Sequence, residues 1–120
     1  MQIQKEGIFM GFEFRDTPVY QEALSFHLAM KRVIDEKKLH PRLADQLYRA
    51  SLSIALNIAE GYGRFHKADK RSFYINSRAS VNECVACLDV IFDSNIPEEY
   101  LNQAETLAKM LSGLINTFTE

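Results

Sequence analysis

Long apolar runs are missing from this chain of 120 residues, and their absence argues against a membrane protein. No segment approaches the roughly 20 consecutive apolar residues that a membrane-spanning helix needs. The first residues, M-Q-I-Q-K-E-G-I-F-M, mix apolar with polar side chains and lack the uninterrupted apolar core of a secretory signal peptide. We therefore expect a cytoplasmic protein with no membrane partner.

Cysteine and histidine are also scarce, which limits metal and disulfide chemistry. Cys84 and Cys87 stand three residues apart in a predicted helix, where side chains on one face are too constrained for an ordinary disulfide. A zinc site takes about four ligands, but the three histidines, His27, His40 and His66, are scattered along the chain. Buried structural thiols are therefore favoured over metal or redox use, and we expect no metal and no cofactor.

Neither sign of charge dominates, because 14 basic residues face 16 acidic ones and leave a net charge of −2 at pH 7. Proteins dedicated to binding nucleic acid are usually basic overall, so this balance argues against that class. The charges are, however, unevenly placed along the chain. Residues 42–78 contain seven Lys or Arg and three Asp or Glu, so this segment is basic while the rest of the chain is acidic.

Four aromatic residues are interleaved with the basic residues of this segment: Tyr62, Phe65, Phe73 and Tyr74. Surfaces that bind single-stranded nucleic acid combine phosphate contacts with base stacking on such rings. The candidate contacts to RNA, DNA or another anion are Arg64, Lys67, Lys70 and Arg71. The alternative, which we favour for this segment alone, is that the rings anchor a core or an interface while the charges face solvent.

Prolines and glycines divide the chain into four segments whose apolar residues recur at steps of three and four, the spacing of one helix face. Strand-like alternation of useful length is absent from the sequence. The expected helix starts are Thr17–Pro18, His40–Pro41, Lys67 and Asn95–Pro97. These segments predict an all-α fold, an antiparallel up-down-up-down four-helix bundle over residues 12–120, after a loose N-terminal leader at residues 1–11.

The stretch N-I-A-E-G-Y-G-R, Asn57–Arg64, admits three interpretations. A phosphate-binding loop needs a preceding strand and a different glycine spacing. A catalytic role for Asn57 and Glu60 needs a nucleophile and a base that the spacing does not supply, so we expect no catalytic residues and no enzymatic activity. The end of a helix fits best, with Gly61 in the left-handed conformation that often follows a helix C-terminus.

Polar residues at helical spacing on the second and third helices form a predicted polar seam between them. Its members are Arg49, Ser53, Asn57, Glu60, Arg78, Ser80 and Glu83. Antiparallel packing places Arg49 near the level of Glu83, so we predict a buried Arg49–Glu83 ion pair, or a network shared with Arg78. Buried polar groups of this kind must be satisfied, and they fix helix register more than they add stability.

The run R-A-S-L-S-I-A-L-N-I-A-E-G-Y-G-R, Arg49–Arg64, resembles the hallmark of the 23S rRNA intervening-sequence protein family, also called the four-helix bundle protein family. Arg78, Ser80 and Glu83 match a second motif, with Ala79 where the family usually has glycine. The resemblance spans about residues 12–118 and implies a bacterial, cytoplasmic bundle that assembles as a ring-like homopentamer without enzymatic activity. The related accessory variability proteins of diversity-generating retroelements are basic and bind nucleic acid and a reverse transcriptase, whereas this chain is slightly acidic.

The third and fourth helices carry a wider apolar arc than one four-helix core needs, and a surplus of that kind is typical of an interface. We therefore predict a non-enzymatic homo-oligomer that serves as an assembly or interaction module, and the family resemblance implies that it is a pentamer. The alternative function is binding of RNA or DNA through the basic and aromatic residues of segment 62–78. The sequence alone also leaves open a protein partner.

Overall fold

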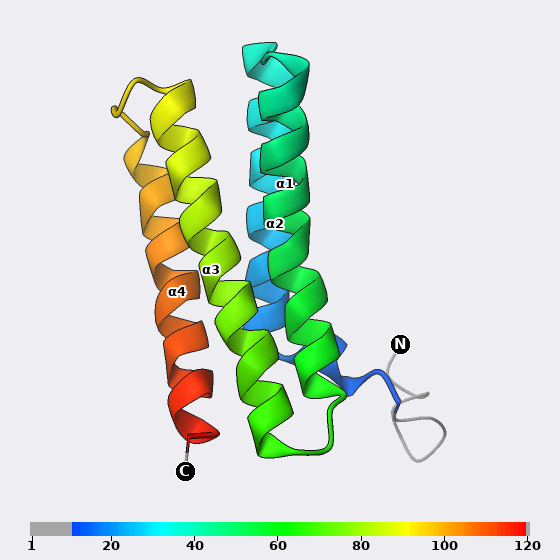
Figure 1. Cartoon of the computed structure of the whole chain (residues 1–120). Coiled ribbons are helices and arrows are strands. Elements are labelled where there is room, and N and C mark those ends of the chain that lie inside the picture. The colour runs from blue at the N-terminus through cyan, green and yellow to red at the C-terminus, as the bar shows by residue number, and fades with distance from the viewer. Residues whose placement is uncertain (1–10, 120) are drawn as a thin grey trace.

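The computed structural model describes residues 11–119, and within that range the chain is helical with no strand. Its elements are η2 (Glu13–Asp16), α1 (Pro18–Lys37), α2 (Pro41–Tyr62), α3 (Lys67–Ile91) and α4 (Glu98–Thr117). Each long helix runs antiparallel to the one before it, with α1 and α2 on one side of the molecule and α3 and α4 on the other (Figure 1). The predicted all-α four-helix bundle is confirmed. The leader predicted at residues 1–11 lies, apart from Gly11, outside the described residues.

Local capping explains why the helices begin where the sequence predicts. The Thr17 hydroxyl accepts a hydrogen bond from the Tyr20 N–H at 3.4 Å, and Pro18 occupies the first helical position, where its missing N–H costs nothing. The His40 ring accepts from the Arg42 N–H at 3.1 Å at the start of α2. The starts of α3 at Lys67 and of α4 at Glu98 also agree with the predicted positions.

Gly61 has a different role from the predicted one. It lies inside α2, which continues to Tyr62, and the capping residue Gly63 has a right-handed conformation with φ −81°. A Cβ atom at Gly61 would lie 2.8 Å from Tyr74 Cε1 and 3.1 Å from Phe73 Cβ, both on α3. The predicted left-handed glycine is therefore wrong: Gly61 is needed because the next helix approaches closely, not because the backbone turns.

The core is built from the inward faces of all four long helices, and the α2–α3 contact is the most extensive of the helix pairs. Large side chains with almost no exposure include Phe26, Met30, Leu47, Ile54, Leu88, Leu107 and Leu111. Fully burying a side chain of this size stabilises the fold by about 1.5–3 kcal/mol before entropy losses are counted. Cys84 and Cys87 belong to this core as free thiols, which confirms their predicted structural role.

Candidate functional site

The predicted polar seam exists at its centre, where hydroxyl and amide groups join α2 to α3. The Ser53 and Ser80 hydroxyl oxygens lie 3.0 Å apart, and the Asn57 amide donates to both the carbonyl and the hydroxyl of Ser53 at 2.9 Å. Deeper in the interface, the buried Ser77 hydroxyl donates to the Ile54 carbonyl at 2.8 Å. These bonds fix the register of the two helices, because a slide of one turn would leave the groups unpaired.

The charged members of the predicted seam do not pair with one another across α2 and α3. Arg49 leaves 77% of its side chain exposed and has Asp45, one turn earlier, at 3.9 Å. Glu83 instead accepts a hydrogen bond from Gln46, and Arg78 reaches toward α4, where it donates to the Ser112 hydroxyl at 2.9 Å. The prediction of a buried Arg49–Glu83 pair is therefore wrong. The guanidinium stays in water, which avoids the desolvation cost of a buried charge.

A contact between His27 on α1 and Ser51 on α2 was not predicted from the sequence. The His27 Nδ1 atom lies 2.7 Å from the Ser51 hydroxyl, and the ring packs edge-on against Tyr48 at 5.0 Å between centroids. Burial, with the nearby charge of Lys31, lowers the pKa of His27. Because Ser51 has no exposed surface, no substrate reaches its hydroxyl. The pair is therefore a structural link between the two helices.

The candidate anion contacts are largely occupied within the chain. Arg64 pairs with Glu60 at 2.8 Å, Arg71 donates to the Thr119 hydroxyl at 2.9 Å, and Lys70 donates to the carbonyls of Tyr62 and Gly61 at 2.8 and 3.3 Å. Lys67 is exposed, and its side chain makes no hydrogen bond or ion pair with the described residues. The structure therefore brings the four cations to one end of the bundle, and among them only Lys67 makes no hydrogen bond or ion pair with the described residues.

Phe65, which lies in the turn between α2 and α3, has 89% of its surface exposed, the largest value among the exposed large apolar residues. Its only ring contact in the described chain is with the neighbouring His66, at 5.0 Å between centroids. An exposed ring two residues before the exposed Lys67 is a minimal version of the basic and aromatic surface that the sequence suggested. The other rings of the segment lie closer to the bundle, and Tyr74 is buried.

A band of apolar side chains covers the outer face of the α1–α2 pair. This α1–α2 strip consists of Leu24, Leu28, Tyr48, Leu52 and Leu56. The residues follow steps of four on each helix, and the His27–Ser51 bond places the two rows at the same level of the bundle. Leu52 is half-buried, and the other four are exposed, with Leu56 at 56%.

The strip lies on α1 and α2, whereas the sequence predicted surplus apolar surface on the third and fourth helices. Those helices expose only Val90 and Leu101 among the large apolar residues that the structure describes. Other apolar residues behind the prediction, such as Cys87, Leu88 and Ile115, are buried within the single chain. Most of the apolar arc of α3 and α4 is therefore buried in the core of the single bundle.

A shallow hollow nevertheless lies on the outer side of the α3–α4 pair. This α3–α4 groove has a volume of about 420 Å³. Its apolar lining comes from Val81 and Val85 on α3 and from Leu101, Ala104 and Ala108 on α4. Glu98 and Glu105 stand at its acidic side, so the groove combines a small-residue floor with a charged border.

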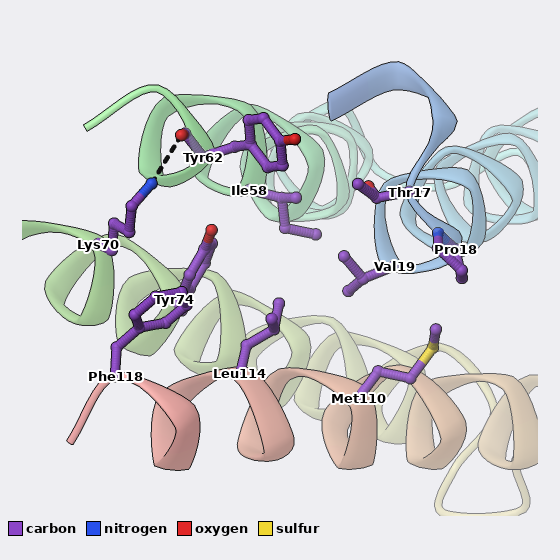
Figure 2. A pocket seen from close by; sticks show the side chains of 10 residues that line it. All are labelled: Thr17, Pro18, Val19, Ile58, Tyr62, Lys70, Tyr74, Met110, Leu114 and Phe118. Carbon is purple, nitrogen blue, oxygen red and sulfur yellow. Dashed lines mark hydrogen bonds between the residues drawn. The ribbon is translucent and has the colours of Figure 1, made fainter. Parts of the chain in front are cut away.

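A second hollow, the end pocket, opens where the start of α1 and the end of α2 face α3 and the end of α4 (Figure 2). Its volume is about 410 Å³, within the range of small-molecule sites. The apolar wall comprises Val19, Ile58, Met110, Leu114 and Phe118. Polar groups from Thr17, Tyr62, Lys70 and Tyr74 border this wall.

The model of the family described as 23S rRNA-intervening sequence protein matches residues 15–117, from η2 to the last residue of α4. The chain belongs to this family. No curated protein and no solved structure matches the chain.

In this member of the 23S rRNA-intervening sequence protein family, the run Arg49–Arg64 has mainly structural contacts. Ser53 and Asn57 form the α2–α3 seam, while Gly61 admits the ring of Tyr74. Glu60 and Arg64 pair with each other one helical turn apart, at the exposed end of α2. The motif that carries the resemblance therefore positions helices rather than gathering reactive groups.

No helix within residues 11–119 is long and apolar enough to cross a bilayer. Over the same residues, the histidines, cysteines and carboxylates form no cluster of three or more that would hold a metal ion.

Proposed function

We propose that this chain is a non-enzymatic interaction module that works by associating with copies of itself. The α1–α2 strip is the observation that carries the proposal. Monomeric proteins rarely leave large contiguous apolar surfaces in water, and such surfaces mark interfaces when they occur. The strip lies at mid-height of the bundle on two rigid helices, so a partner that covers it removes four exposed large side chains from water.

The second apolar surface favours a head-to-tail arrangement. The strip belongs to the α1–α2 pair and the groove to the α3–α4 pair. These two helix pairs lie on opposite sides of the bundle (Figure 1), so one copy's strip can enter the next copy's groove. Contacts between two different surfaces generate a ring when the rotation closes. The family resemblance supports five copies in that ring.

Replacing Leu28 and Leu56 together with glutamate tests this proposal. The double variant places two charges in the strip without touching the buried core, so it should remain helical and sediment as a monomer. Val90→Glu is the matched control, because Val90 is 66% exposed and lies outside both surfaces. We expect the wild type and Val90→Glu to form the same oligomer at micromolar concentration in analytical ultracentrifugation. A monomeric wild type would overturn the proposal.

A second candidate function, binding of RNA or DNA at the α2–α3 turn, is favoured by the exposure of Phe65 beside Lys67. In a ring, the turn would be repeated in every copy, and repetition multiplies a weak contact. Titration of a labelled structured RNA at two salt concentrations tests it, since phosphate contacts weaken as salt rises. Binding that is salt-sensitive in the wild type and lost in a Phe65→Ala, Lys67→Glu variant supports this function, whereas no salt-sensitive binding removes it.

A further inference from the structure

The end pocket lies outside the surfaces proposed for self-association, since its lining shares no residue with the α1–α2 strip or the α3–α4 groove. Two rows of side chains face each other across it, with Ile58 and Val19 on one side and Leu114 and Phe118 on the other (Figure 2). Tyr74 and Phe118 lie against each other at 5.9 Å between ring centroids, which gives one end an aromatic wall. A space of this size and character accommodates the apolar body of a small molecule.

Lys70 supplies a fixed positive charge at the border of this pocket. Its ammonium group donates to the carbonyl of Tyr62 at 2.8 Å (Figure 2). It also donates to the carbonyl of Gly61 at 3.3 Å, and both acceptors lie at the end of α2. An ammonium has three donors, so one N–H remains after these two bonds. No carboxylate of the described residues pairs with Lys70. The charge is therefore held in position and lacks an anionic partner within residues 11–119.

Tyr74 adds a neutral donor on the same side of the cavity. Its hydroxyl points toward the opposite wall of the pocket and makes no hydrogen bond with the residues that the structure describes (Figure 2). Burial raises the pKa of Tyr74, so the hydroxyl keeps its proton at neutral pH. Among residues 11–119, no carboxylate side chain lines the pocket, so none of these residues places a negative charge against an anion.

We propose that the end pocket binds a small monocarboxylate with an apolar body, such as a medium-chain fatty acid. The chain lies between Ile58 and Leu114, and the carboxylate accepts the remaining N–H of Lys70. A monoanion suits this border better than a phosphate dianion, because Arg64 and Arg71, the neighbouring cations, are already bonded within the chain. The neutral and cationic analogues of such a ligand lack the charge that Lys70 complements.

Calorimetric titration of the full chain with decanoate, decanol and decylammonium tests this proposal without any mutation. All three share the apolar body, so their affinities differ through the head group. A charge-assisted hydrogen bond to a fixed ammonium should make decanoate bind about tenfold or more tightly than decanol, with decylammonium weakest. Equal binding of the three probes, or no binding of decanoate, would overturn the proposal.

Three variants then locate the site. Lys70→Met keeps the side-chain length and should reduce the decanoate preference over decanol to near one, while Lys70→Arg should retain a preference. Leu114→Trp fills the pocket and should abolish binding of decanoate and decanol alike. Lys67→Met is the matched control, because Lys67 is exposed and outside the lining. An unchanged preference in helical Lys70→Met, or its loss in Lys67→Met, would contradict the assignment.

Discussion

At the scale of single residues, the position of a side chain around α2 decides whether it contacts α3 or faces solvent. Ser53, Asn57 and Ser80 form a hydrogen-bonded seam, whereas Arg49, on the same helix as two of them, faces solvent. Gln46, three residues before Arg49 on α2, contacts Glu83 in place of the predicted Arg49. A periodicity of three and four defines a face but leaves its border uncertain by one position.

Arg49→Ala should therefore leave stability almost unchanged. The side chain is largely exposed and its pairing with Asp45 is a surface contact, so the free energy of unfolding should shift by less than about 0.5 kcal/mol. Asn57→Ala, which removes a seam amide from half-buried surroundings, should cost about 1 kcal/mol. Urea denaturation of both variants checks the comparison, and a larger loss in Arg49→Ala would contradict this placement.

Gly61 and Gly113 provide a matched pair of substitutions within helices. At Gly61, a methyl group meets the Tyr74 ring at 2.8 Å, so Gly61→Ala should destabilise the fold by about 1–3 kcal/mol. A Cβ atom at Gly113 would meet no described atom within 4 Å beyond its own stretch of helix, so Gly113→Ala should stabilise the fold by about 0.5–1 kcal/mol through helix propensity. Thermal and chemical denaturation should move in opposite directions for the two variants, and shifts of the same sign would refute the close-approach account.

At the scale of the elements, helix starts were the most predictable feature because their signals are local. Thr17 and His40 hydrogen-bond to backbone groups two or three residues ahead and directly precede a proline, so the sequence contains all the partners. The role of Gly61 depends on a ring thirteen residues later on another helix, and the end pocket is assembled from the ends of all four helices. Neither has a signature in one segment.

The link between α1 and α2 should make stability depend on pH. The pKa of His27 is lowered in the folded chain, so below its ordinary value of 6.5 the unfolded chain binds more protons than the folded one. Stability from this group is complete above pH 6.5 and is lost as the pH falls toward the folded pKa. The urea midpoint should therefore drop between pH 7.5 and 5.5, and His27→Gln should show a smaller drop. An equal drop in both would exclude His27 as the cause.

At the scale of the whole molecule, the bundle presents three distinct surfaces: the α1–α2 strip, the α3–α4 groove and the end pocket. The sequence indicated that apolar surface would exceed the needs of the core and placed the excess on the third and fourth helices, whereas more of the exposed large apolar side chains lie on α1 and α2. The reason is physical: periodicity identifies apolar faces, whereas the packing of all four helices decides which faces are covered. Burial within the bundle accounts for most of the apolar arc on α3 and α4.

The measurement that tests head-to-tail association most directly is a mixing experiment with two variants that each lack one surface. The Leu28→Glu, Leu56→Glu double variant has a damaged strip and an intact groove, while Leu101→Glu has the reverse. Each alone should sediment as a monomer, and an equimolar mixture should form heterodimers through the one intact strip–groove contact. A mixture that stays monomeric while the wild type forms oligomers would contradict the head-to-tail interface.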